Sequence, residues 1–255
     1  EVNLVSSSAP SCDATNDGSI DISSNGGTGI YTYTWIPSVS SGPSASGLAG
    51  DTTYQIWVAD SAGCQDSIVV GLNSPPPLDA SITGNNEICH GDTVKLSLSG
   101  TGGTPDYSYL WLQTGTVDSS LIAFPVSNTI YDAVVIDING CIDSASLAIT
   151  VNPLPNVAFD VDTNAGCVPL TVVFSNFSDS SVTCHWDVGD GLVDSCNSFT
   201  HTYNSPGVYD VQLTITDTNG CEAGYLDTSY IHVFETPTAD FDADPWAASV
   251  NTPTI

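Results

Sequence analysis

Hydrophobic and polar residues alternate with a period of two over most of the chain. The clearest runs are residues 54–58, 130–136 and 209–216. This period is that of a β-strand with one buried face and one exposed face. Turn-forming Gly, Pro, Asn and Ser residues interrupt the runs, and no segment of useful length has a helical period. The pattern therefore predicts an all-β chain of short strands.

The same pattern places the strands along the chain. In the first third we expect strands at 19–22, 31–35 and 54–58. The other predicted strands lie at 79–83, 94–98, 107–111, 130–136, 144–151, 157–159, 170–174, 184–186, 199–203, 209–216 and 225–233.

One segment occurs three times: a strand that begins at a tyrosine, runs to an aspartate and a turn with glycine, and ends at a cysteine. These cysteines are Cys64, Cys141 and Cys221, which are 77 and 80 residues apart. A fixed period of this length indicates tandem repeats. We therefore divide the chain into modules at 1–77, 78–154 and 155–235, followed by a remnant at 236–255.

A second set of cysteines, Cys12, Cys89 and Cys167, repeats with steps of 77 and 78 residues, so each module holds two cysteines that are 52 to 54 residues apart. This constant separation predicts the bridges Cys12–Cys64, Cys89–Cys141 and Cys167–Cys221, one within each module. Cys184 and Cys196 then form a local fourth bridge. Paired cysteines indicate an oxidising compartment. A bridge between two modules would contradict this interpretation of the spacing.

Two cysteines that bracket a tryptophan, among short strands separated by turns, are typical of an immunoglobulin-like β-sandwich. We expect three such sandwiches in tandem, forming an extended acidic rod. Modules of this size bury only a modest core, and a bridge that closes about 50 residues removes about 4 kcal/mol of unfolded-state entropy. The bridges are therefore expected to decide whether each module stays folded.

Charge excludes one class of partner and disfavours another. Lys95 is the only basic side chain against 29 acids, which gives a net charge of −28. Without a cationic patch the chain cannot meet the phosphates of nucleic acid, and anionic lipid surfaces are disfavoured. No apolar run is long enough to span a membrane.

The third module carries the strings Trp186-Asp-Val-Gly-Asp-Gly191, His201-Thr-Tyr203 and Pro206-Gly-Val-Tyr209. These strings resemble the signature of the polycystic kidney disease (PKD) domain. Val188 in place of phenylalanine and the additional pair Cys184 and Cys196 are departures from that signature. The resemblance implies a structural role for His201.

The first module contains Asn16-Asp-Gly-Ser-Ile20, Gly26-Gly-Thr-Gly29, Tyr33-Thr-Trp35 and Asp60-Ser-Ala-Gly-Cys64. It is similar to the SprB-type repeats of the gliding adhesins of Bacteroidota, and the second module resembles the immunoglobulin-like repeats that accompany them. The resemblance implies a piece of a long extracellular surface protein or filament, exported by type IX secretion, that mediates attachment or surface contact. Its partners would be neighbouring modules of the same chain or filament, glycans or cell surfaces.

Two alternatives remain open. PKD domains also serve as non-catalytic spacers in secreted hydrolases. The other alternative comes from the remnant, where residues 237–244 repeat the beginning of the third module. One or two strands cannot form a sandwich. We therefore expect the protein either to continue past Ile255 or to complete a neighbouring subunit by strand exchange, as a self-assembling filament subunit.

The sequence indicates no enzyme. It has no nucleophile elbow, no zinc-protease motif and no phosphate-binding loop, and its four histidines are scattered. Asp187 and Asp190 could form a carboxylate pair, but the glycines beside them are more typical of a tight hairpin turn.

Calcium is the one cofactor the sequence suggests. Asp13, Asp17 and Asp21 take positions one, five and nine of an EF-hand-like loop, with Gly18 at position six. Ser24 stands where the bidentate glutamate belongs, and a plain turn into a strand is the alternative. Acidic clusters at module junctions offer a second set of ligands for bridging Ca²⁺, with solvated carboxylates as the alternative. They are Asp137, Asp143, Asp160 and Asp162, and then Asp217, Asp227, Asp240, Asp242 and Asp244.

Two kinds of surface site complete the predictions. Alternation places Trp57 on the outer face of its strand, and Val134 and Ile136 take equivalent positions in the second module. This partly apolar strip predicts a docking face for a module, a filament copy or a glycan, unless a loop of the same module covers it. Candidate O-glycosylation positions that follow an aspartate are Thr52, Ser61, Ser67, Thr93 and Ser144.

Overall fold

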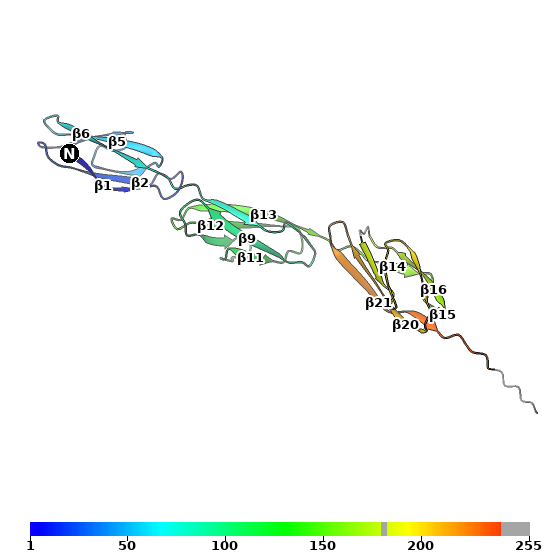
Figure 1. Ribbon diagram of the computed structural model, residues 1–255. Helices are drawn as coiled ribbons and strands as arrows, with labels where there is room; N and C mark the ends of the chain where they lie inside the picture. The colour runs from blue at the N-terminus through cyan, green and yellow to red at the C-terminus, as the bar shows by residue number, and fades with distance from the viewer. Residues whose placement is uncertain (180–182, 241–255) are drawn as a thin grey trace, which may run out of the picture. The chain divides into compact units, whose positions relative to one another are not determined.

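The computed structural model describes residues 1–179 and 183–240, which fold into β-strands joined by turns and loops (Figure 1). The chain divides into two compact units, Glu1–Asn152 and Pro153–Ile255. The first unit contains two hydrophobic cores and the second contains one. The predicted all-β class of tandem immunoglobulin-like and PKD-like sandwiches is confirmed. Within the described ranges, no helix has the length and apolar character needed to cross a membrane.

The first sandwich packs two antiparallel three-stranded sheets face to face. One sheet has the order β1-β2-β4 and the other β3-β5-β6. Their strands are β1 (Val2–Ser8), β2 (Gly18–Ser24), β3 (Thr32–Ile36), β4 (Ser44–Leu48), β5 (Thr52–Ala59) and β6 (Gln65–Leu72). Inward-facing side chains such as Ile20, Trp35 and Ile56 fill the space between the sheets.

The second sandwich pairs a three-stranded sheet, β11-β9-β7, with a four-stranded sheet, β10-β12-β13-β8. Its strands are β7 (Asp79–Thr83), β8 (Glu87–Cys89), β9 (Val94–Thr101), β10 (Ser108–Trp111), β11 (Ser120–Ala123), β12 (Thr129–Ile136) and β13 (Ile142–Asn152). The short strand β8 lies parallel to the end of β13. Leu96, Trp111 and Val135 are fully buried between the sheets.

The third sandwich pairs the sheet β14-β16-β19 with a five-stranded sheet, β15-β21-β20-β17-β18 (Figure 1). Its strands are β14 (Phe159–Val161), β15 (Ala165–Cys167), β16 (Leu170–Asn176), β17 (Thr183–Asp187), β18 (Leu192–Asp194), β19 (Phe199–Tyr203), β20 (Gly207–Thr216) and β21 (Glu222–Phe234). Phe159, Phe174 and Phe199 surround Trp186 with ring centroids 5.2 to 5.7 Å from its own.

All three cores are built around one tryptophan. Trp35, Trp111 and Trp186 are each no more than 2% exposed. Each indole N–H donates to a backbone carbonyl, 2.9 to 3.0 Å away, in a loop seven to nine residues later in the chain. A buried indole that kept no hydrogen-bond partner would be destabilising, so this bond fixes the loop as well as the ring.

Each predicted strand overlaps an observed one, but the strand predicted at 157–159 is found at Phe159–Val161 and shares only its first residue with the prediction. The strands that the pattern missed are edge strands, namely β1, β4, β6, β8, β11, β15 and β18. β1 shows why, because only Val2 is buried among its seven residues. An edge strand with one buried residue has no alternation for the sequence to reveal. The module boundaries that we drew stay a prediction, and most of the remnant, residues 241–255, lies outside the described residues.

The predicted disulfide bonds within modules are wrong. Cys12 bonds to Cys141, which joins the first sandwich to the second, and Cys64 and Cys167 are free thiols. Cys89 and Cys221 are disulfide-bonded. The predicted partner of Cys89 was Cys141, which is bonded to Cys12, and the predicted partner of Cys221 was Cys167, which is a free thiol. Cys89 and Cys221 therefore do not form their predicted bonds. The fourth predicted bridge, Cys184–Cys196, is confirmed.

The strands explain why the predicted pairs cannot form. Cys141 directly precedes β13, whereas Cys89 pairs with Asn152 at the far end of that 11-residue strand. At about 3.3 Å per residue the two cysteines lie roughly 30 Å apart, whereas a disulfide requires Cα atoms within about 7 Å. In the third sandwich Cys221 precedes β21, and Cys167 pairs with Phe234 at the end of β21. The constant loop length thus reflects a constant module size and not proximity.

Candidate functional site

The same aspartate turn precedes the second cysteine of every sandwich. The carboxylates of Asp60, Asp137 and Asp217 each accept hydrogen bonds of 2.8 to 2.9 Å from the backbone N–H groups two and four residues later. The fourth residue is the cysteine in each case. The glycine before it has a φ between +81° and +85°, a conformation that glycine adopts without strain. Each turn therefore holds its cysteine in the same local geometry.

In the first two sandwiches the second carboxylate oxygen ties the turn to the glycine-rich loop. Thr28 donates its N–H to Asp60 at 2.9 Å, and Thr104 donates to Asp137 at 2.8 Å. Asp137 is only 4% exposed. Burial alone would raise the pKa of Asp137, but its backbone hydrogen bonds prevail and hold that pKa below its usual value. The turn is therefore stabilised by an ionised carboxylate.

The turn of the second sandwich contacts the loop between β1 and β2 of the first. The bond Cys12–Cys141 joins them, with Cα atoms 5.7 Å apart. Beside it, the Asn139 amide donates to the carbonyl oxygen of Ser11 at 3.1 Å and to the hydroxyl of Thr104 at 3.0 Å. We call this contact the Cys12–Cys141 junction. It joins consecutive sandwiches by one covalent bond and one side-chain hydrogen bond.

Asp17 shapes the first-sandwich side of the junction. Its carboxylate accepts hydrogen bonds from the Ser11 hydroxyl at 2.6 Å, from the Ser11 backbone N–H at 2.9 Å and from the Thr15 hydroxyl at 3.0 Å. These bonds lower the pKa of Asp17. They also position the Ser11 carbonyl to accept the Asn139 amide, and the neighbouring Cys12 to bond with Cys141.

The structure does not gather Asp13, Asp17 and Asp21 into a calcium loop. Asp21 lies within β2 and accepts hydrogen bonds from the hydroxyls of Ser44 and Ser6, which lower its pKa. Asp17 is directed toward Ser11 instead. Across residues 1–179 and 183–240, no group of three or more His, Cys, Asp or Glu side chains could hold a metal ion.

Several acids predicted at module junctions bond within their own sandwich. Asp143 accepts the backbone N–H of Ala80 at 2.7 Å, and Asp162 accepts that of Val173 at 2.8 Å. Asp160 accepts the Tyr230 hydroxyl at 3.3 Å. Asp242 and Asp244 lie outside the described residues.

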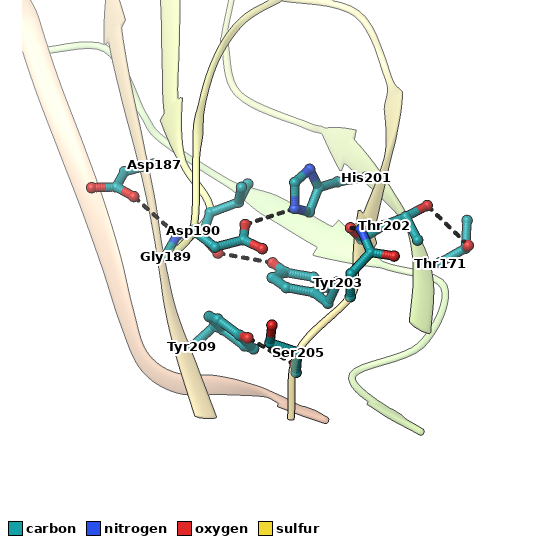
Figure 2. Close-up of polar contacts among 11 residues, drawn as sticks. Thr171, Asp187, Gly189, Asp190, His201, Thr202, Tyr203, Ser205 and Tyr209 are labelled. Carbon is teal, nitrogen blue, oxygen red and sulfur yellow. Dashed lines mark hydrogen bonds and ion pairs between the residues drawn. The ribbon is translucent and has the colours of Figure 1, made fainter. Parts of the chain in front are cut away.

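The PKD-like strings of the third sandwich form a closed polar turn, which Figure 2 shows. The Asp187 carboxylate accepts the backbone N–H of Gly189 at 2.9 Å, as expected for a tight turn. The Asp190 carboxylate lies 2.7 Å from Nε2 of His201, whose ring packs edge-on against Tyr203. These contacts hold the hairpin between β17 and β18 against β19.

Tyr203 anchors this turn from inside the sandwich. Its ring is fully buried, and its hydroxyl donates to the carbonyl oxygen of Val188 at 2.9 Å (Figure 2). Burial raises the pKa of the Tyr203 hydroxyl, and the negative charge of Asp190 raises it further. A tyrosine held neutral in a core is a packing element, so this cluster positions the turn.

The predicted docking strip lies on the outer face of β5 and β12. Trp57 is 40% exposed, and Val134 and Ile136 are half-buried. Sequence reasoning missed two neighbouring apolar side chains that are more exposed than Trp57. They are Ile36 and Val69, which are 55% and 59% exposed and lie on either side of Gln55 in the strand register. Ile36 and Val69 come together only through the pairing of β3 and β6 with β5. The linear sequence does not display this pairing.

The candidate glycosylation positions differ in accessibility. Thr93 and Ser144 are exposed, and Ser67 is half-buried. The hydroxyls of Thr52 and Ser61 donate to backbone carbonyls of Gly50 and Thr28. Glycosylation stays a prediction at all five.

Comparison with known families agrees with the geometry of the first and third sandwiches. Residues 150–233 match the model of the PKD domain, and residues 5–40 match the model of the SprB repeat. The chain carries repeats of the SprB and PKD types. Repeats of these types are typically non-catalytic, and they support an extracellular structural or adhesive role for the segment. No curated protein matches the chain.

Solved structures that resemble the chain include tandem and single modules. The three N-terminal domains of the outer capsid protein Hoc of bacteriophage RB49 align over 93% of this chain and 98% of their own, with 12% identity and a TM-score of 0.48. The PKD1 domain of the Vibrio cholerae metalloprotease PrtV is 25% identical over 31% of this chain and 98% of its own (TM-score 0.27). A Ca²⁺-stabilised ice-binding adhesin of an Antarctic bacterium aligns over 91% of this chain and 74% of its own, with 15% identity and a TM-score of 0.40.

Proposed function

We propose that this segment is a structural and adhesive part of a long extracellular surface protein or filament that mediates attachment or surface contact. Covalent bonds between consecutive modules hold the segment together under tension. Export through the type IX route of Bacteroidota belongs to this proposal and rests on the likeness of the repeats to gliding adhesins. The observation that carries the proposal is the Cys12–Cys141 junction, because a bond between modules serves the array and not the single module.

The position of the bridge suits an element that transmits tension along the chain. Cys12 and Cys141 are 129 residues apart in sequence, so the bond encloses most of both sandwiches. A force applied between the residues before Cys12 and those after Cys141 is transmitted by the disulfide bond. The residues enclosed by the bond cannot be unfolded by that force while the bond is intact. A bridge within one module would leave the linker between modules as the weakest point.

The outward strip around Trp57 supplies the adhesive part of the proposal. Trp57, Ile36 and Val69 expose apolar surface on a sheet whose other face is packed on the core. Exposed apolar strips of this kind mark contact surfaces. A glycan, a cell surface or a module of another filament is the partner that we propose.

Immunoelectron microscopy of producing cells tests this function. Antibodies raised against the purified chain should label filaments or a layer outside the outer surface, and their Fab fragments should reduce attachment of the cells to glass. Fab fragments against an unrelated surface protein are the control. Label confined to the cell interior, or found only on a soluble secreted hydrolase, would refute the proposal.

A further inference from the structure

Two exposed thiols, Cys64 and Cys167, stand at positions that correspond to the two halves of the Cys12–Cys141 junction. Both are unbonded and exposed. Cys64 is the second cysteine of the first sandwich and corresponds to Cys141. Cys167 is the first cysteine of the third sandwich and corresponds to Cys12.

Cys64 matches Cys141 in its surroundings. The backbone hydrogen bonds of the Asp60 turn repeat those of the Asp137 turn: the N–H of the cysteine reaches the carboxylate at 2.8 and 2.9 Å, and the cysteine carbonyl accepts the N–H of the aspartate at 3.0 Å in both. The side chains of the two turns are not all the same, because Ala62 takes the place of Asn139. One of these two cysteines is bonded to a neighbouring module, and the other is exposed.

Both second cysteines also lie where the chain enters its sandwich. The N–H of Val2, at the beginning of β1, donates to Asp66 at 2.8 Å, two residues after Cys64. The N–H of Ala80, near the beginning of β7, donates to Asp143 at 2.7 Å, two residues after Cys141. Cys64 and Cys141 therefore mark the entry end of their sandwiches.

The first cysteines lie at the opposite end, where the chain leaves. Cys167 pairs with Phe234, the last residue of β21, and Cys89 pairs with Asn152, the last residue of β13. The Ser11 loop, which carries Cys12, lines one pocket together with Asn73 and Ser74, just after β6 ends. The first cysteine thus marks the exit end of each sandwich.

The Cys12–Cys141 junction joins an exit-end cysteine to an entry-end cysteine. We propose that Cys64 and Cys167 are an unpaired entry half and an unpaired exit half of the same junction. Each forms a disulfide with the complementary cysteine of another module of this kind, and in the purified chain that module belongs to a second copy. This inference deepens the proposed function and rests on it for its use in the cell.

The reaction requires an oxidant. The two thiols lose two protons and two electrons and form one S–S bond, while a small-molecule disulfide such as oxidised glutathione is reduced to two thiols. The thiolate of Cys64 or Cys167 attacks that disulfide, and the second protein thiol then displaces the glutathione thiolate.

A complementation experiment on the full chain tests the pairing. The variants Cys64→Ser and Cys167→Ser are prepared with Cys12–Cys141 and Cys184–Cys196 intact and are mixed in equal amounts in a glutathione redox buffer. Random pairing gives as many heterodimers as both homodimers together. We expect heterodimers in about tenfold excess, which corresponds to a docking preference of about 1.4 kcal/mol. The unmodified chain should form a ladder of covalent oligomers.

Peptide mapping of the heterodimer should find Cys167 of one copy bonded to Cys64 of the other. Homodimers at the random proportion, monomers capped only by glutathione, or, in the unmodified chain, a Cys64–Cys167 bond within one copy would each overturn the inference. The proposed function fails separately: correct heterodimers together with antibody label inside cells would refute the function alone, whereas surface label without heterodimers would refute the pairing alone.

Discussion

Removing the Cys12–Cys141 bond should destabilise the first unit, whereas removing the matched thiol Cys64 should not. The perturbation is the double variant Cys12→Ser with Cys141→Ser, which leaves no unpaired partner to rearrange. The control is Cys64→Ser, which changes the same residue type in the same aspartate turn. If the bridges formed within modules, Cys64→Ser would also be destabilising, because Cys64 would then be bonded to Cys12.

The magnitude follows from the enclosed loop. With the two cysteines 129 positions apart in sequence, the chain-entropy model gives about 5 kcal/mol at 25 °C as the stabilisation, and measured values often fall below the model. Cys64→Ser removes an exposed thiol, so its effect should stay within about 0.5 kcal/mol. The expected difference between the two variants is therefore several kcal/mol.

Urea unfolding followed by tryptophan fluorescence measures this difference, because Trp35 and Trp111 are buried in the two sandwiches that the bond joins. The double variant should shift the transition midpoint to lower urea, and Cys64→Ser should leave it in place. Equal destabilisation by both variants, or none by the double variant, would refute the reasoning.

Three further predictions concern single side chains. Trp111→Ala should lower the free energy of unfolding by about 3–5 kcal/mol because its indole is fully buried, whereas Trp57→Ala should cost less than about 1 kcal/mol in the same urea assay; equal losses would place Trp57 in a core. Tyr203→Phe should cost about 1–3 kcal/mol, because the buried carbonyl of Val188 loses its donor, and an unchanged melting temperature would contradict this. The hydrogen bonds that lower the pKa of Asp137 stabilise the fold above the unfolded value of about 3.9, and this contribution is lost as the pH falls through the lower folded pKa. Calorimetric melting should therefore decline less between about pH 4 and pH 2 in Asp137→Asn than in the parent, and identical pH profiles would count against it.

The sequence predicted the central strands because their residues alternate between a core and an outer face. In β12, Tyr131, Ala133 and Val135 are buried, and the residues between them are half-buried. The PKD-like turn was also predictable, since Asp187 and Gly189 are local in sequence. Edge strands such as β1 escaped, because a strand with one neighbour and little burial needs no alternation.

The disulfide pairing was not predictable from spacing. Equal separation in sequence records how long each module is, but a bridge depends on which end of a strand each cysteine occupies. Cys141 and Cys89 lie at opposite ends of β13, and that becomes visible only once β8 is known to pair with Asn152. The calcium loop failed for a related reason. Asp21 belongs to the alternating strand β2, where its carboxylate accepts the hydroxyls of Ser6 and Ser44, whereas the Asp17 carboxylate accepts the hydroxyl of Ser11.

The most direct test of covalent joining between modules is peptide mapping of native material without reduction. Because Lys95 is the only basic residue, trypsin is of no use, and pepsin at acid pH both cleaves the chain and prevents thiol exchange. A peptide containing Cys12 bonded to one containing Cys141 is the predicted result, with Cys64 absent from any bond within its own module. A Cys12–Cys64 peptide, or a Cys89–Cys141 peptide, would contradict the account.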